Sequence, residues 1–145
     1  MAAVVRNKQM AVSRGALFQV ITDFEKYPEF LPEVVGVQRE SGGSSTSPLV
    51  TFELEIVKRF RYTLEFAILG QGEVKWQLRS SDFFKTNQGK WVLREIDSST
   101  TDVQYEIEVE FGFLVPGWIS RKLTEVSLPK MLDAFEERAN KLKWR

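Results

Sequence analysis

The stretch GWISRKLTEVSLPKMLDAFEERANKLK, residues 117–143, decides the fold. Most apolar residues of its second half recur at three- and four-residue steps, which predicts one stripe of an α-helix: Leu128, Met131, Leu132, Phe135, Ala139 and Leu142. A helix over the whole stretch would be about 40 Å long at 1.5 Å per residue. Its stripe needs a large apolar partner, and the preceding chain reads mostly as strands. The sequence therefore predicts a long C-terminal helix packed on a sheet.

The first half of this stretch carries a second stripe. Ile119, Leu123 and Val126 point roughly 150° away from the later stripe at 100° per residue, and the change of face coincides with Pro129. A proline inside a helix removes one hydrogen bond and crowds the carbonyl four residues back. We therefore expect the helix to kink or break between Glu125 and Pro129, with Ser127 able to cap the second segment.

Composition narrows the function classes. The chain of 145 residues is the size of one domain, residues 1–145, and its 20 basic and 20 acidic residues cancel. Nucleic-acid binders usually carry a basic excess, so we expect no nucleic-acid partner. No apolar run approaches the roughly 18 residues of a membrane span. Arg6 and Lys8 interrupt any signal-peptide pattern, which makes the cytoplasm the expected location.

Cysteine and histidine are both absent from the sequence. Their absence removes disulfides, Cys or His zinc ligands and Ser-His or Cys-His catalytic arrangements. It also removes the commonest general acid–base residue. We expect no metal, no cofactor and no catalytic residue, so a binding role is favoured over an enzymatic one.

The rest of the chain reads as two short helical pieces within a series of strands. Residues 3–12 read as a strand, Ser13 as the N-cap of a helix over 14–23, and residues 23–32, with two prolines, as a turn or 3₁₀ piece. Residues 34–37 suggest a second strand. Strict alternation then predicts half-buried antiparallel strands around residues 50–56, 60–68, 74–79 and 103–111, with another around Trp91 and Leu93.

A hairpin register follows from the alternation. Gly70-Gln71-Gly72 fits a three-residue loop between two strands. Closing the hairpin there places Ile68 opposite Val74, Phe66 opposite Trp76 and Leu64 opposite Leu78. All six then share one face, as the pleat requires. We predict that Phe66 and Trp76 face the long helix.

Two segments carry a family resemblance. Residues 23–32, DFEKYPEFLP, and residues 131–139, MLDAFEERA, resemble segments of the START-like (SRPBCC) superfamily, in particular its coenzyme-Q-binding and ribosome-association-toxin branch. The sequence departs from that branch at Glu33-Val34, where a Trp-Cys pair is usual, and at Pro129. The resemblance implies an α+β helix-grip fold. In that fold a curved antiparallel sheet of about seven strands wraps around the long C-terminal helix, and two short helices follow the first strand.

The resemblance also implies a ligand cavity between sheet and helix. We expect its ligand-binding residues among large side chains on the inward faces: Phe52, Tyr62, Phe66, Trp76, Trp91, Tyr105, Met131 and Phe135. A solid core is the alternative for each of them. The expected portal combines the turn after the first helix with the apolar connection before the last one: Tyr27, Phe30, Leu31, Phe113, Leu114 and Trp118. Its apolar side chains would also allow a transient membrane contact.

Three function classes remain open. The first is binding or transport of a hydrophobic small molecule, such as a lipid, an isoprenoid quinone or a polyketide-like compound. The second is a cyclase or aromatase acting on polyketide-like substrates, although alternation sends Glu53, Glu65 and Glu106 to the outer face. The third is a protein-interaction module of the ribosome-association-toxin type, whose partner the sequence does not specify.

Overall fold

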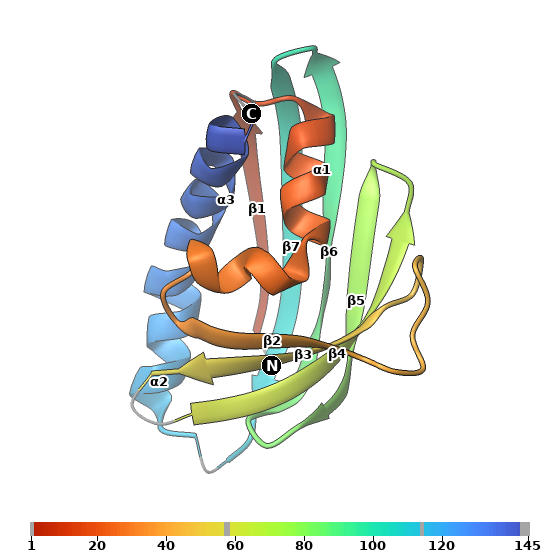
Figure 1. Cartoon of the computed structure of the whole chain (residues 1–145). Helices are drawn as coiled ribbons and strands as arrows, with labels where there is room; N and C mark the ends of the chain where they lie inside the picture. The colour runs from red at the N-terminus through yellow and green to blue at the C-terminus, as the bar shows by residue number, and fades with distance from the viewer. Residues whose placement is uncertain (1, 57–58, 114, 143–145) are drawn as a thin grey trace.

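A computed structural model describes residues 2–56, 59–113 and 115–142 of the chain. Seven antiparallel strands form one sheet in the order β1-β7-β6-β5-β4-β3-β2. Their bounds are β1 (Ala2–Met10), β2 (Val34–Glu40), β3 (Leu49–Glu55), β4 (Arg59–Leu69), β5 (Glu73–Ser81), β6 (Phe84–Asp97) and β7 (Thr100–Phe111). The sheet bends so that β2, β3 and β4 run across the direction of β1, β7 and β6 (Figure 1). This bend creates the inner face that the helices cover.

Two short helices connect β1 to β2. The helix α1 (Arg14–Thr22) begins where the Ser13 hydroxyl accepts a hydrogen bond from the Ala16 amide at 3.2 Å. A 3₁₀ helix, η1 (Phe24–Glu29), follows and contains Pro28. The expected elements and the Ser13 cap are confirmed. Asp23 makes no side-chain capping bond to η1.

The hairpin between β4 and β5 has the expected register. Ile68 lies opposite Val74, Phe66 opposite Trp76 and Leu64 opposite Leu78. Phe66 and Trp76 are both buried in the main core. Period-two alternation therefore determined this pairing correctly, and it sends both aromatic rings to the helix-facing side.

The C-terminal stretch is helical throughout, but its helix type changes. It begins as α2 (Gly117–Arg121), widens into a π-helical segment, η2 (Lys122–Ser127), and continues as α3 (Leu128–Leu142). Pro129 offers no N–H to the carbonyl four residues earlier, and the wider π turn before it makes room for its ring. The interruption overlaps the predicted interval but lies a turn earlier. Leu128 keeps α-helical torsions, and Ser127 therefore does not open a separate helix.

Each apolar stripe has its own partner. Leu128, Leu132, Phe135 and Ala139 of α3 join the main core. Ile119 of α2 packs with Phe60 and Phe83 in a second cluster, which Leu123 borders. Val126, by contrast, remains 45% exposed. The change of face therefore places the two halves of the stretch on different apolar surfaces.

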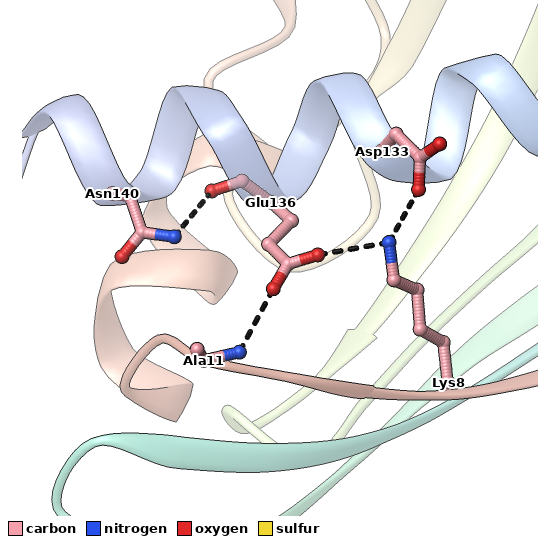
Figure 2. A network of polar contacts seen from close by, with 5 residues as sticks. All are labelled: Lys8, Ala11, Asp133, Glu136 and Asn140. Carbon is pink, nitrogen blue, oxygen red and sulfur yellow. Dashed lines mark hydrogen bonds and ion pairs between the residues drawn. The ribbon is translucent and has the colours of Figure 1, made fainter.

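Polar contacts attach α3 to β1. Figure 2 shows the Lys8 ammonium between Asp133 and Glu136, with 2.8 Å to the Glu136 carboxylate. The other Glu136 oxygen accepts a hydrogen bond from the Ala11 amide at 2.9 Å. Burial opposes the charge on Lys8, but hydrogen bonds to the two carboxylates outweigh it and raise the Lys8 pKa. Lys8 therefore keeps its charge at neutral pH, and the stabilisation from that charge is lost as the pH rises through the raised pKa.

The opposite side of α3 is attached to η1. Arg138 forms an ion pair with Glu29, and its guanidinium lies 5.4 Å from the centre of the Phe30 ring. Contacts on two sides thus hold α3 in place. Among the described residues, η2 has a single ion pair to the rest of the fold, between Lys122 and Glu33 at 3.2 Å.

Candidate functional site

A cavity of about 470 Å³ lies between the inner face of the sheet and the helices η2 and α3. This volume falls within the roughly 300–1,000 Å³ typical of small-molecule sites. The structure places all eight residues expected to bind a ligand in its lining: Phe52, Tyr62, Phe66, Trp76, Trp91, Tyr105, Met131 and Phe135. Whether they contact a ligand stays a prediction.

Strand alternation explains why these side chains converge. Inward residues of β3 to β7 form the floor and walls, and one face of α3 forms the roof. Phe135 is central to the roof. Its ring makes edge-to-face contacts with Tyr27, Phe30 and Trp91 at centroid distances of 5.3, 5.1 and 5.0 Å. The roof is therefore rigidly packed on one side while the cavity lies on the other.

Asn87 is the polar residue that the sequence reading missed. It lies on β6, is 4% exposed and lines the cavity. Its side-chain oxygen accepts a hydrogen bond from the Trp76 indole N–H at 3.0 Å. Asn87 shares the inward parity of Trp91 and Leu93, but β6 extends much further toward its N-terminal end than predicted. Continuing the alternation back from Trp91 could have identified it.

Three tyrosines line the cavity with different partners. The Tyr27 hydroxyl donates to the Ile21 carbonyl at 2.6 Å. The hydroxyls of Tyr62 and Tyr105 make no hydrogen bond with the described residues. Burial raises the pKa of both, and for Tyr105 the nearby Tyr62 adds to this effect. Both phenols therefore stay protonated at neutral pH and remain available as hydrogen-bond donors.

The surface-exposed lining residues mark the opening of the cavity. Lys122, Val126 and Lys130 lie on the helical side, and Glu33 lies on the segment before β2. The ion pair between Lys122 and Glu33 therefore spans the opening. Charged groups at the opening and neutral groups deeper inside give the cavity an amphipathic profile.

The expected portal residues are only partly at this opening. Tyr27 and Leu31 line the cavity. Phe30 instead packs against Phe135. Phe113 and Trp118 are exposed, at 92% and 48%, and neither is among the lining residues. Leu114 lies outside the described residues. The portal assignment thus stays a prediction, and the geometry favours Glu33, Lys122 and Lys130 as its rim.

The outer face of the sheet offers a second hollow, of about 680 Å³. Its charged and amide side chains mostly contact one another: Lys90 pairs with Glu106 at 3.6 Å, and Gln88 donates to Glu108 at 2.8 Å. Glu65 likewise accepts from Gln77 and Arg79 at 3.1 and 3.0 Å. These cross-strand pairs are typical of a solvated sheet surface. The inner cavity is the stronger candidate because it is apolar and has unpartnered polar groups.

The described part of the chain contains no group of three or more acidic residues placed to hold a metal ion. No helix within it is long and apolar enough to cross a membrane.

The sequence is similar to a known protein family and to proteins of known sequence. The sequence pattern of the family described as "Polyketide cyclase / dehydrase and lipid transport" matches residues 10–136. Ribosome association toxin RatA of Vibrio cholerae is 25% identical over 144 residues, which cover 98% of both chains.

Solved structures agree on the fold. A START superfamily protein from Mycobacterium smegmatis superposes with a TM-score of 0.79 at 22% identity, covering 97% of this chain and 98% of that one. The Zhui aromatase/cyclase from Streptomyces sp. R1128 gives the same TM-score at 13% identity, with 97% and 94% covered. With the bent sheet and the long C-terminal helix, these matches show that the chain belongs to the polyketide cyclase/dehydrase and lipid transport family, with a START-like helix-grip fold.

Proposed function

We propose that this protein binds a hydrophobic small molecule, such as a lipid, an isoprenoid quinone or a polyketide-like compound, in the inner cavity. One observation carries the proposal: aromatic and aliphatic side chains enclose about 470 Å³ that no side chain fills. Protein cores normally pack to crystal-like density, so an open space of this size leaves apolar side chains facing water instead of other apolar atoms. A bound apolar molecule would replace that water.

Mass spectrometry of an organic extract from the purified protein tests this proposal. Wild-type protein should release a hydrophobic compound in a fixed molar ratio. Ala134 lies on α3 and lines the cavity, so Ala134→Phe should fill the space and abolish the signal. Ala67 belongs to β4 and lies on the outer face, which makes Ala67→Phe a matched control that retains the compound. Equal amounts of the compound released from the two folded variants would contradict binding in this cavity.

Access to the cavity would require movement of the π-helical side of the opening. Contacts on two sides hold α3, whereas η2 is joined to the opposite rim by the Lys122–Glu33 pair. Residues 117–127 should therefore exchange backbone amide hydrogens faster than residues 130–142 in the empty protein, and slow when a hydrophobic ligand binds. Hydrogen exchange monitored by mass spectrometry checks this expectation. Uniform protection over both segments, unaltered by ligand, would contradict a movable rim.

A second candidate function is association with ribosomes, since the Vibrio cholerae relative is named for that role and the likeness spans 98% of both chains. The purified protein would then pellet with ribosomes through a sucrose cushion and remain in the supernatant without them. The Ala134→Phe variant separates the two functions, because filling the cavity leaves the outer surface unchanged. Absence from the ribosome pellet would leave ligand binding as the supported function.

A further inference from the structure

We propose that the cavity recognises an uncharged carbonyl oxygen on an otherwise apolar molecule, and that Asn87 and Tyr105 are the residues that hold it. This inference rests on the proposed function, since it names the chemical feature that the same cavity selects.

The orientation of the Asn87 amide follows from its neighbour. The Trp76 indole N–H can only donate a hydrogen bond, so the amide must present its oxygen to it, and the two atoms lie 3.0 Å apart. The amide nitrogen then points away from the indole with both its hydrogens free of any described partner. Asn87 lines the cavity and is 4% exposed, so a ligand is the natural acceptor for these hydrogens.

Tyr105 supplies a second donor beside the same indole. Its ring lies 5.5 Å from that of Trp76, it is 5% exposed, and its hydroxyl has no described partner. Asn87 and Tyr105 thus both neighbour the same indole. Among the described residues the fully buried side-chain polar atom without a partner is Nε of Arg14, so the Asn87 amide and the Tyr105 hydroxyl are open to the space of the cavity, where a ligand can reach them.

The charge pattern selects the kind of acceptor. The charged lining residues among those described, Glu33, Lys122 and Lys130, are at the opening. Around Trp76 the polar groups are a neutral amide and protonated phenols, so a buried carboxylate or phosphate would have no countercharge there. A ketone, quinone, ester or amide oxygen accepts from such donors without bringing in charge.

Trp76 lies close to the backbone of β6. Gly89 lies opposite Trp76 in the β5–β6 pairing, and a Cβ on it would lie 2.7 Å from the indole. The absent side chain leaves room for the indole, whose N–H reaches Asn87 on the same strand. The donor pair is therefore positioned by rigid strands and not by a loop.

Two shape-matched probes test the inference: 2-acetylnaphthalene, which has a carbonyl oxygen, and 2-isopropenylnaphthalene, which has a methylene group in its place. Titration calorimetry on the ligand-stripped protein should show about tenfold tighter binding of the ketone, the effect of one or two net hydrogen bonds. Tyr105→Phe should reduce the preference several-fold. Asn87→Leu should remove most of it when compared in a Trp76→Phe background, where no indole N–H is left to take the place of the amide.

Tyr27→Phe is the matched control. Tyr27 also lines the cavity, but its hydroxyl already donates to the Ile21 carbonyl. This variant should lose less of the ketone preference than Tyr105→Phe does, and this comparison holds even if Asn87→Leu unfolds. Equal affinity of the wild type for the two probes would overturn the inference while leaving the hydrophobic site intact. Failure of both probes to bind would overturn the proposed function, and the inference with it.

Discussion

Phe135→Ala should lower the free energy of unfolding by about 3 kcal/mol, the lower end of the range for removing a buried phenylalanine. The ring is 1% exposed and meets Tyr27, Phe30 and Trp91 edge to face. Those three contacts would be lost together with the buried apolar area. The loss should not reach the upper end of the range, because Phe135 lies beside the cavity, where neighbouring side chains have room to close in on the space that the ring leaves. Denaturant melts monitored by tryptophan fluorescence would measure it.

Met131→Ala provides a comparison on the same helix. Met131 lies one turn before Phe135 and also lines the cavity, but it is only partly buried and its flexible chain has fewer fixed neighbours. Met131→Ala should lower the free energy of unfolding by no more than about half as much as Phe135→Ala. The dependence of that free energy on denaturant concentration should not change. A loss near 5 kcal/mol for Phe135→Ala would instead describe a solid core at that point. Equal losses for the two variants would contradict the packing of the roof.

Gly89→Ala should destabilise the fold by about 3 kcal/mol, the upper end of what overpacking commonly costs. A Cβ at this position would lie 2.1 Å from the Glu106 carbonyl oxygen and 3.0 Å from the Ile107 Cα. Both atoms belong to the backbone of β7, which is paired with β1 on its other side and cannot move away freely. The indole of Trp76 would also be displaced. Thermal and denaturant melts should show the loss, and hydrogen exchange should locate it between β6 and β7.

Gly72→Ala is the control for Gly89→Ala. Gly72 is the last residue of the β4–β5 turn, and a Cβ there would lie 3.8 Å from the Leu93 carbonyl oxygen, an ordinary contact. Its effect should stay within about 0.5 kcal/mol, as for most surface substitutions. Similar losses at both glycines would contradict the close approach of β7 as the reason for the requirement at Gly89, because the entropy of the unfolded chain alone makes Gly→Ala stabilising.

Local periodicity determined much of this fold from the sequence. Alternation assigned Phe66, Trp76 and Tyr105 to the inner face, because neighbouring side chains on a strand must point to opposite sides of the sheet. The loop at Gly70 then fixed the β4–β5 register, because a slip of one residue would turn every apolar side chain to solvent. The same reasoning placed the eight expected ligand-binding residues on inward faces, and the cavity that they line was what the family resemblance implied.

Other features depend on neighbours that the sequence does not reveal. The role of Asn87 needed the position of Trp76 on another strand, and the requirement for Gly89 needed the distance to β7. The rim between Glu33 and Lys122 joins segments 89 residues apart, and no local pattern pairs them. The sequence also does not reveal the π-helical turn, because a proline predicts an irregularity in the helix but not the geometry that accommodates it.

The sequence by itself thus determined which face each side chain takes, because that depends on backbone geometry repeated every two or 3.6 residues. Only the tertiary structure decided that the inner faces of five strands enclose a space instead of filling it. A cavity is the difference between the volume that the bent sheet and helix enclose and the volume that their side chains occupy. That difference depends on the bend of the sheet and on the position of α3, which contacts with β1 and η1 hold from two sides.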